Sequence, residues 1–562
     1  MRAKFVIQEQ SQPLVKPMKA MTQIFLLLVL LALFMPFVNK PFNIDDPLFL
    51  WAAEHIRHNP LDFYGFDVNW HEKVMPMATV TKNPPLFSYY LAGVGTLFGW
   101  SEVVMHLAVM VPLIALALGT FRLAGQLDAN PLQASLISIC TPVVMVSGTT
   151  VMCDVPMVAL WVWAVSFWID GNEAPYHNWR LCAAGLLMTA AGLTKYFGAS
   201  LIPLLAAYSL MQRTPVRRWL PSLLVPVFVF LLYNWVTYRM YGIGLLADAF
   251  TYSSQARQDL QPSTIARIID CLSFTGGGLI GALFFTPLLF GRKGQLICAV
   301  GLVSISIISC LWGMGGGTNW SISVQQAAFI MAASVLLSVV LSDLIENRDG
   351  KSLLLVLWVV GTFVFAGMVN WTVSERNILP MAPAAGILIS RRLTRNGPLC
   401  SKFHRAGFAV ALLPALSVSL LVTFADYRWA DEMHKAVQRI SLSRPKAGQS
   451  LWFQGHWGFQ YYMERNGGKS LDFAASKALS GDMFVSPSFN TNMNEQLGDQ
   501  LDSIGEIQTT PFSWLAVMAP EKAAGFYSSF FGPVPYVFGR VNAEKYTVYA
   551  FKKNMSFIQS TK

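Results

Sequence analysis

Apolar runs of membrane-spanning length recur along the first three quarters of the chain. A helix needs about 17–25 such residues to cross the hydrocarbon core. The first run, Gln23 to Val38, follows a basic segment and lacks a small-x-small cleavage site, so it predicts a retained anchor with a cytoplasmic N-terminus. The later runs are Val103–Leu123, Leu132–Thr149, Val155–Ile169, Leu181–Leu193, Phe197–Leu210, Leu220–Val236, Phe274–Phe290, Leu296–Trp312, Ala327–Leu344, Leu353–Val369, Ile378–Ile389 and Phe408–Phe424. Together they predict about thirteen crossings.

The segment Pro84–Trp100 is apolar but short, starts with two prolines and contains glycines. The positive-inside rule decides its placement. If it does not cross, all the basic clusters between later runs fall on the cytoplasmic side: Arg213/Arg217/Arg218, Arg292/Lys293, Arg348/Lys351 and Arg391/Arg392/Arg395. We therefore expect a juxtamembrane helix on the outer face.

The same parity divides the chain into three parts. We expect a cytoplasmic N-terminus over residues 1–20, a transmembrane catalytic domain over 21–426 with a first outer loop at 39–102, and an extracytoplasmic domain over 427–562. The last part has ordinary polarity. Its strand-like runs at Leu451–Phe453, Asp482–Val485 and Tyr546–Phe551, with a helical stretch at Gly458–Glu464, predict a small α/β domain. The fold class is thus an all-α polytopic membrane protein that carries a small α/β C-terminal domain.

The composition agrees with a membrane protein. Of the 562 residues, 54% are hydrophobic and only 13% are charged, whereas soluble proteins carry about 25% charged residues. These values exclude a soluble enzyme, a disordered chain and a nucleic-acid binder. The seven cysteines are scattered without a C-x-x-C pair, which argues against a disulfide framework or a thiolate metal site.

Charged side chains stand against the membrane in several places on the predicted outer side. A charge at mid-bilayer costs about 2.5–3.5 kcal/mol on insertion scales, so such residues are usually functional. They are the pair Asp45/Asp46, Lys82, Asp154, Lys195 and the pair Glu375/Arg376. Because each lies near the outer end of a different helix or in the first outer loop, we expect them to converge on one cavity.

This set of groups suits the displacement of a lipid phosphate by a hydroxyl or an amine. A carboxylate takes the proton of the nucleophile, a step worth about 10²–10⁴ in rate. Lys195 and Arg376 would hold the phosphate and neutralise the charge that develops on it. Each residue also has a structural explanation: Asp45 and Asp46 as helix caps before Pro47, Lys195 as a snorkelling side chain, Arg376 as the partner of Glu375.

A metal site is a weaker alternative. His55 and His58 are spaced i, i+3 near His71, but no full ligand pattern is present. We expect no metal and no certain cofactor, with a divalent cation as the only candidate.

Several of these residues lie in motifs that resemble the GT-C integral-membrane glycosyltransferases. The pieces, in order, are Asn43-Ile-Asp-Asp-Pro47, Lys82-Asn-Pro-Pro-Leu86, Cys153-Asp154-Val-Pro, Gly192-Leu-Thr-Lys195 and Glu375-Arg376-Asn-Ile-Leu-Pro380. The chain is most similar to the glycosyltransferase 39 group, which includes protein O-mannosyltransferases and aminoarabinose transferases that act on lipid A. The Trp-Trp-Asp-Tyr-Gly signature of oligosaccharyltransferases is absent.

The resemblance implies roles for the candidate residues. Asp45 stands at the position of the catalytic base and Asp46 at that of the second acid, while Asp154 lines the same cavity. Lys195 and Arg376 match basic residues near the lipid phosphate. This chain has Asn83 where the family has His or Lys before the Pro-Pro pair, with Lys82 one residue earlier.

The resemblance also implies the reaction. A hexosyl or pentosyl group passes with inversion from a polyprenyl-phosphate-linked donor to a glycolipid, a lipopolysaccharide or a protein, in a bacterial inner membrane with the site on the periplasmic side. Membrane lipids are expected partners, and nucleic acid is not.

Two other functions fit parts of the pattern. A transporter or flippase of polar lipids would also hold charges in a helical bundle, although such proteins carry internal repeats and charges near mid-membrane. A non-catalytic envelope protein could bind sugar through the aromatic residues of its tail: Trp452, His456, Trp457 and Tyr461/Tyr462. Loss of function on changing Asp45 alone would distinguish the enzyme from both.

Overall fold

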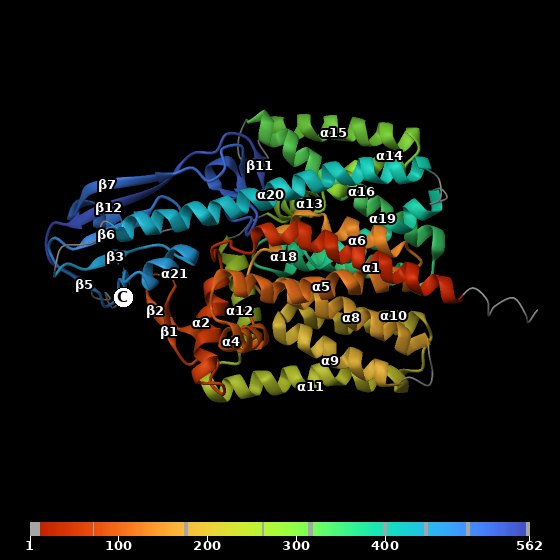
Figure 1. Ribbon diagram of the computed structural model, residues 1–562, viewed down its shortest axis with the longest axis horizontal. Coiled ribbons are helices and arrows are strands. Elements are labelled where there is room, and N and C mark those ends of the chain that lie inside the picture. The colour runs from red at the N-terminus through yellow and green to blue at the C-terminus, as the bar shows by residue number, and fades with distance from the viewer. Residues whose placement is uncertain are drawn as a thin grey trace, which may run out of the picture.

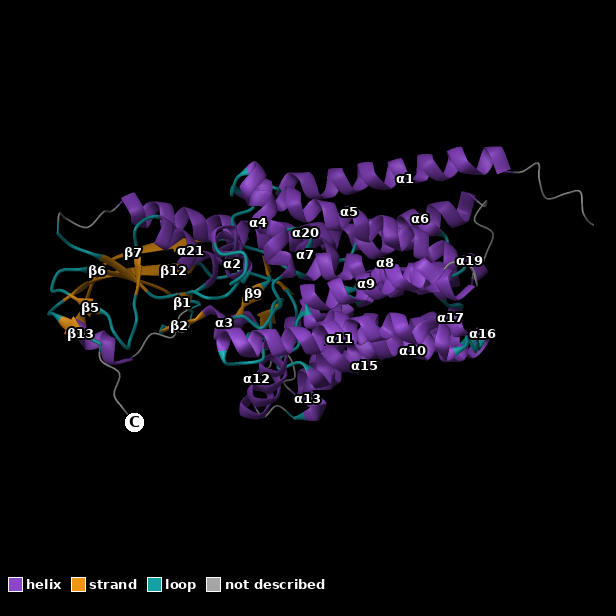
Figure 2. Cartoon of the chain, turned by 90° about the horizontal axis from the view of Figure 1, so that it is seen from below, coloured by secondary structure: helices purple, strands orange, loops and turns teal. Residues whose placement is uncertain are grey.

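The protein consists of a helical bundle and a strand-containing domain at one end of it (Figures 1 and 2). The computed structural model describes residues 12–70, 72–173, 178–260, 263–312, 319–396, 402–442, 448–490 and 495–557. The bundle runs from α1 to the first half of α20, and the strands of the C-terminal domain lie together beyond its end.

Seven helical segments of the described chain are long and apolar enough to cross a membrane. They lie in α1 (Gln12–Phe34), α5 (Glu102–Gln126), α11 (Val216–Tyr241), α15 (Arg292–Trp312), α16 (Trp320–Asn347), α17 (Gly350–Val364) with its continuation η3 (Phe365–Val369), and α20 (Lys402–Leu442). Helices α13 (Thr264–Gly278) and α14 (Gly281–Leu289) form an eighth candidate, bent by 78° at the break between them.

The remaining apolar runs form shorter helices, which Figure 1 shows within the same bundle. They are α6 (Pro131–Ile139), α7 (Pro142–Ser147), α8 (Asp154–Glu173), α9 (Asn178–Thr194), η2 (Tyr196–Ser200), α10 (Leu201–Met211), α18 (Glu375–Ile378) and α19 (Met381–Asn396). The run Leu132–Thr149 is divided because Pro142 disfavours a helical residue before it, and Thr141 caps α7 by accepting a hydrogen bond from Val144 N. The expected count of about thirteen crossings stays a prediction.

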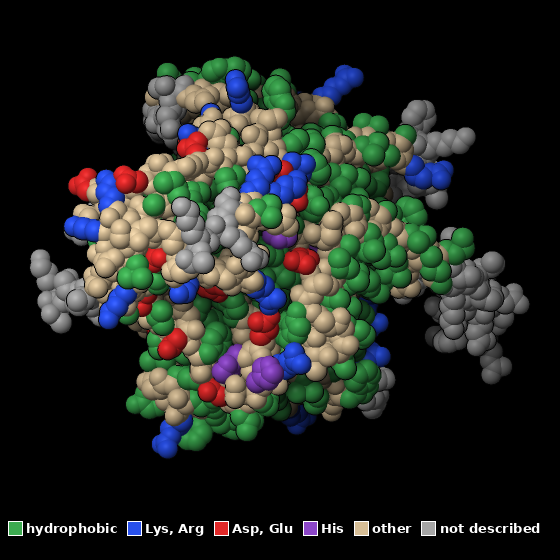
Figure 3. All heavy atoms as spheres, turned by 60° about the vertical axis from the view of Figure 1, so that its left-hand side comes forward, with side chains coloured by type: hydrophobic (Ala, Val, Ile, Leu, Met, Phe, Trp, Pro, Cys, Tyr) green, Lys and Arg blue, Asp and Glu red, His purple; other side chains and the backbone are tan. Residues whose placement is uncertain are grey.

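The outer surface of the bundle is apolar, as a lipid-facing surface must be. Only 6% of the apolar window of α15 is buried, and its Leu296, Ile297 and Val303 side chains are more than half exposed. Figure 3 shows hydrophobic side chains over much of the visible bundle. The chain is an integral membrane protein.

The segment between α1 and α5, which the sequence predicts to be the first outer loop, folds against the end of the bundle (Figure 1). It contains α2 (Asp46–His58), the hairpin of β1 (Asp67–Asn69) and β2 (Val74–Pro76), α3 (Met77–Val80) and α4 (Leu86–Phe98). Helix α4 has 13 residues, roughly 20 Å of helix, which is shorter than the hydrocarbon core. It packs on α2 through Phe49 and Phe87, whose ring centroids are 5.7 Å apart.

The second connection on this side also folds. Helix α12 (Leu245–Leu260) occupies most of the expected outer loop between α11 and α13, and it packs against α11.

The C-terminal domain is built on a five-stranded mixed sheet in the order β4-β3-β6-β12-β7. Its strands are β3 (Leu451–Phe453), β4 (Lys469–Ser470), β6 (Met483–Pro487), β7 (Leu501–Thr509) and β12 (Glu544–Phe551). Strand β3 is parallel to β4 and β6, and β12 is antiparallel to β6 and β7. Helix α21 (Trp457–Arg465) connects β3 to β4. The predicted α/β character of this domain is confirmed.

Several short strands and 3-10 turns lie outside the main sheet, and the segment around Tyr536 and Phe538 contacts the bundle. They are β5 (Lys477–Ala478), β8 (Leu515–Ala516), β9 (Met518–Ala519), β10 (Ala524–Gly525), β11 (Val537–Phe538) and β13 (Met555–Ser556), with the 3-10 turns η1 (Met35–Phe37), η4 (Glu495–Gln500) and η5 (Pro520–Lys522). Gln325 of α16 donates a hydrogen bond to Phe538 O (2.9 Å), and Tyr536 donates one to Gly277 O (3.0 Å).

Helix α20 joins the two parts without a break. Its 41 residues correspond to roughly 60 Å of helix, and Figure 1 shows it running from the bundle along the sheet. The domain border expected at residue 426 therefore falls inside α20.

Charged residues at the other end of α16 form a separate network. Arg391 donates a hydrogen bond to Asp343 (2.9 Å), and both side chains are almost fully buried. Arg392 and Arg395 pair with Glu346. These arginines belong to the cluster that the positive-inside rule places in the cytoplasm.

The two ends should lie on opposite sides of the membrane. We expect Trp514→Cys, in the C-terminal domain, to react with a membrane-impermeant maleimide in cells whose outer membrane has been permeabilised and whose inner membrane is intact. Lys293→Cys, at the start of α15, should react at least tenfold less until the inner membrane is opened. Both variants are made without Cys182 and Cys400. Equal labelling of the two positions in intact cells would contradict the topology.

Candidate functional site

Arg376 lies at the centre of an ion-pair network at the domain end of the bundle. It is part of the short helix α18, and its guanidinium binds two carboxylates. Nη1 is 2.5 Å from Asp45 Oδ2, and Nε is 2.9 Å from Asp154 Oδ2. A guanidinium offers five donors in a fixed plane, so it can bind two acceptors and still have donors left.

Asp154 joins this network to Lys195. Asp154 begins α8, and its Oδ1 is 2.5 Å from Lys195 Nζ. Lys195, which directly precedes η2, also donates to Asn377 Oδ1 at 3.3 Å. Asp45, Arg376, Asp154 and Lys195 thus alternate in charge, and three different helical segments and the first outer loop contribute them.

Asp45 is the most exposed member of this network. Its side chain is 29% exposed, against 13% for Arg376 and Lys195 and 2% for Asp154. Asp45 occupies the N-cap position of α2, yet its side chain makes no capping hydrogen bond. The structural explanation by helix capping therefore does not apply to Asp45. Lys195 and Arg376 both pair with Asp154, and Arg376 does not pair with Glu375.

Asp46 has a different environment from Asp45. It is fully buried, and its carboxylate accepts hydrogen bonds from Asn43 N (2.9 Å) and Val151 N (2.8 Å). Burial raises the pKa of Asp46 to about 7, although Lys40 and the two backbone N–H groups act in the opposite direction. Asp46 connects the loop that carries Asp45 to the loop that leads to Asp154.

The backbone immediately before Asp45 and Asp46 is strained. Ile44 has a φ of 50°, which is rare for a β-branched residue. Such a conformation costs about 1–3 kcal/mol and persists only where the surroundings enforce it. The hydrogen bonds of Asp46 to Asn43 N and Val151 N hold this turn in place, so that Asp45 faces the opposite way.

Lys82 lies next to the network but pairs elsewhere. Its Nζ is 2.6 Å from Asp248 Oδ2 and 2.8 Å from Thr79 O, and it lies 5.0 Å from the centre of the Tyr252 ring. Burial and then the charge of Asp45 raise the pKa of Tyr252. Tyr252 therefore contacts Lys82 and lies close enough to Asp45 to feel its charge.

Asn83 contacts the residue before Asp154. Its Oδ1 is 3.6 Å from Cys153 Sγ, and its backbone carbonyl accepts a hydrogen bond from Tyr64 Oη (2.9 Å). Asn83 stands where the proteins that the sequence resembles have His or Lys. Lys82, which pairs with Asp248, is therefore the cation of this motif.

Glu375 is separate from the charged network. It is fully buried in α18, and a methyl group added at Gly278 would lie 1.9 Å from its Oε2. Burial raises the pKa of Glu375 well above its usual range, and the Gly278 backbone N–H acts in the opposite direction. The expectation that Glu375 lines the cavity with Arg376 is not matched by this placement, because Glu375 packs on the end of α13.

The C-terminal domain holds the segment that carries Arg376. Glu375 N donates to Phe526 O (3.0 Å), Ser529 N donates to Val373 O (2.7 Å), and the hydroxyls of Thr372 and Ser528 are 2.9 Å apart. These contacts fix the backbone on both sides of the turn before α18.

Tyr527 reaches further into the bundle. Its hydroxyl donates to Asp426 Oδ1 (2.9 Å), and Asp426 also pairs with Lys40. Both members of that ion pair are buried, and the charge of Lys40 acts on Asp46. No pattern in the sequence indicated Tyr527, Asp248 or Tyr252, because their contacts depend on which segments meet in space.

The described residues contain no group of three His, Cys, Asp or Glu side chains placed to hold a metal ion. His71, one of the histidines considered for such a site, lies outside the described residues. The carboxylates of Asp45 and Asp154 are engaged by Arg376.

Comparison with known proteins agrees with the resemblance found in the sequence. Residues 82–238 match the family described as dolichyl-phosphate-mannose-protein mannosyltransferase. No curated protein matches the chain. The matched segment includes Lys82, Asp154 and Lys195 but neither Asp45 nor Arg376.

Solved structures of membrane glycosyltransferases share the fold. The oligosaccharyltransferase of Archaeoglobus fulgidus in its apo form has a TM-score of 0.50 and 11% identity, over 80% of this chain and 64% of that protein. This chain thus spans less than two thirds of that protein's length.

Two further structures match at lower TM-scores. ArnT from Cupriavidus metallidurans, bound to undecaprenyl phosphate, has a TM-score of 0.40 and 13% identity, over 86% of this chain and 96% of that one. The arabinofuranosyltransferase AftD from Mycobacteria has a TM-score of 0.37 and 13% identity, over 94% and 41%. With the family match and the fold together, the predicted resemblance is confirmed: the chain is similar to the GT-C integral-membrane glycosyltransferases.

Proposed function

We propose that the protein transfers a sugar from a polyprenyl-phosphate-linked donor to an envelope acceptor, a glycolipid, lipopolysaccharide or protein. The observation that carries this proposal is the network of Asp45, Arg376, Asp154 and Lys195. In it the partly exposed carboxylate of Asp45 pairs with Arg376, and Asp154 links Arg376 to a second cation, Lys195. A base for the acceptor and cations for a phosphate leaving group are the groups that this displacement needs.

In the proposed reaction, Asp45 takes the proton of the acceptor hydroxyl as its oxygen attacks the anomeric carbon. The bond from that carbon to the phosphate oxygen breaks, and the configuration inverts. The phosphate that leaves carries the bonding electron pair, and Arg376 and Lys195 neutralise its charge. Arg376 uses only Nε and Nη1 on the carboxylates, so its Nη2 remains for the phosphate.

Lys82 and Tyr252 extend the proposed cavity on the side of α12. The Lys82 ammonium, 2.6 Å from Asp248, would give the lipid phosphate a third cation if that pair opens. Asp46 and Glu375 act in this proposal as positioning residues, because both are fully buried.

The proposed setting is a bacterial inner membrane. Residues 1–20 are cytoplasmic, the catalytic domain extends to residue 426, and the domain from residue 427 onward is periplasmic. The support is the distribution of basic residues, since the arginines near Asp343 and Glu346 lie at the far end of α16 from the site.

The proposal is tested with matched membranes that contain wild type or Asp45→Asn. They receive radiolabelled polyprenyl-phosphate sugars of hexose and pentose type, with envelope extract as acceptor. We expect transfer from one donor in wild type and at least a hundredfold loss in the variant, because Asn cannot take the proton. The control is Asp502→Asn, an exposed carboxylate on β7, which should keep full activity.

Two outcomes would contradict the proposal. Equal transfer by wild type and Asp45→Asn would exclude Asp45 as the base. Movement of the donor lipid across the membrane without loss of its sugar would favour a flippase.

Asp46 should be needed for stability and geometry rather than for the proton transfer. Asp46→Ala leaves two buried N–H groups without acceptors, each at a cost of about 1–3 kcal/mol, so we expect a lower Tm in detergent. The pH dependence of the residual transfer should keep the shape of the wild-type profile. A changed profile at an unchanged Tm would assign Asp46 to the chemistry.

Tyr527 should couple the C-terminal domain to the site. Tyr527→Phe removes the hydrogen bond to Asp426 at a cost of about 1–3 kcal/mol, which we expect to lower both Tm and kcat while KM for the donor stays within about twofold. Tyr549→Phe, on the outer part of β12, is the matched control. Equal behaviour of the two variants would show that the domain does not support the site through Tyr527.

A further inference from the structure

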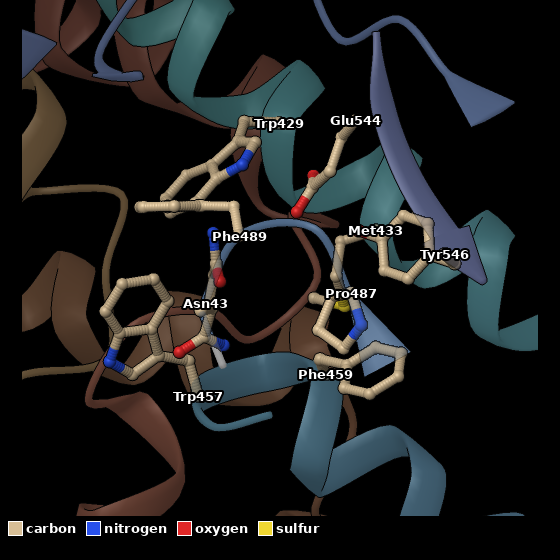
Figure 4. Close-up of a pocket in the computed structure, with 10 residues that line it drawn as sticks. Asn43, Trp429, Met433, Trp457, Phe459, Pro487, Phe489, Glu544 and Tyr546 are labelled. Carbon is tan, nitrogen blue, oxygen red and sulfur yellow. The ribbon is translucent and has the colours of Figure 1, made fainter. Parts of the chain in front are cut away.

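A pocket lies between the C-terminal domain and the loop that carries Asp45. The empty space between its lining residues is about 260 Å³ with the open mouth included. The enclosed part has room for about one water molecule, and therefore for one hydroxyl group. Helices α20 and α21, the end of β6 and β12 surround it. Figure 4 shows its lining: Asn43, Trp429, Met433, Trp457, Phe459, Pro487, Phe489, Asn490, Glu544 and Tyr546. None of these residues takes part in the ion-pair network around Arg376.

Asn43 gives the pocket an unsatisfied donor. Its side chain is 5% exposed, and its Nδ2 is buried without a hydrogen-bond partner in the described part of the chain. A buried N–H group without an acceptor is costly. An acceptor atom on a ligand would therefore bind favourably at this point.

Glu544 supplies an acceptor on the same pocket. Burial raises the pKa of Glu544 to about 7, although hydrogen bonds with the side chains of Tyr546 and Trp429 act in the opposite direction. The charge of Glu521 raises the pKa further. No cation of the described chain is paired with Glu544. A ligand anion is thus disfavoured here, whereas an O–H donor would stabilise the carboxylate.

Aromatic rings form the apolar side of the pocket. The ring centroid of Trp457 is 6.0 Å from that of Trp429 and 5.7 Å from that of Phe489. Trp457 is only partly buried although it borders a packed cluster. Of the aromatic residues expected to form a sugar platform, Tyr461, Tyr462 and Trp452 are core residues, and Trp457 alone lines this pocket.

We propose that the pocket binds the hydroxyl-bearing edge of a neutral sugar, whose C–H face packs on Trp457. A hydroxyl both accepts from Asn43 Nδ2 and donates to Glu544, which an ammonium group cannot do because it has no acceptor. An apolar pocket with a few convergent polar groups is the usual form of a small-ligand site.

The pocket and the proposed reaction site are connected by the short segment from Asn43 to Asp45. Asn43 precedes Asp45 by two residues, and its backbone N–H binds Asp46. This part of the inference rests on the proposed function. The sugar in the pocket is then a residue of the acceptor, next to the acceptor residue that receives the transferred sugar.

Saturation-transfer NMR on the intact protein in detergent tests the pocket directly. The probes are methyl α-mannopyranoside, methyl α-glucopyranoside, the methyl glycoside of glucosamine and that of glucuronic acid. We expect the neutral glycosides to receive saturation at their ring C–H protons. Trp457→Leu and Glu544→Met should each reduce it at least fivefold, and Trp514→Leu, which changes an exposed tryptophan of the same domain, should not.

The variants separate this site from the reaction site. Asp45→Asn should keep the signal, and Tm of each variant shows whether it is folded. Absence of signal from every glycoside, a signal from the amino glycoside alone, or a signal lost in Asp45→Asn but kept in both folded pocket variants would overturn the proposal. Failure of sugar transfer with an intact pocket signal would contradict the proposed function alone.

Discussion

The pairing of Arg376 with Asp45 and Asp154 is the interaction on which the domain end of the bundle depends. The Asp154 carboxylate and the Arg376 guanidinium are largely withdrawn from water there, which is tolerable only because each charge has a partner. Lys195 completes the balance on Asp154. Removal of one member would leave a buried charge uncompensated, so the same contacts that make the site reactive also fix the relative position of α2, α8, η2 and α18.

The C-terminal domain is part of this arrangement rather than an appendage. The backbone around Val373 and Glu375 is bound by the loop of Phe526 and Ser529, and Tyr527 stabilises the buried pair of Asp426 and Lys40. The continuous helix α20 keeps the domain at a fixed distance from the bundle. A domain anchored in this way can form one wall of a substrate site without disturbing the ion pairs.

Much of the architecture could be predicted from the sequence because it follows from periodicity and charge. The apolar runs form helices, and the strands at 451–453, 483–487 and 544–551 were predicted to within two residues at each end, whereas β7 at 501–509 was not predicted. The positive-inside rule placed Asp45, Asp154, Lys195 and Arg376 on one side, which is why their convergence could be expected. The number of crossings was less accessible, since breaks such as that before Pro142 divide an apolar run into short helices.

Other features depend on contacts that no local pattern records. Asp45 and Asp46 are neighbours in sequence, yet Asp45 is partly exposed and Asp46 is fully buried. The turn that separates their environments begins at Ile44, which has a positive φ. Lys82 is paired by Asp248 from a distant helix. An experimental map with a bound polyprenyl phosphate tests the central claim most directly. The account predicts its phosphate within hydrogen-bonding distance of Arg376 and Lys195, and a phosphate at the far end of the bundle, near Arg392 and Arg395, would contradict it.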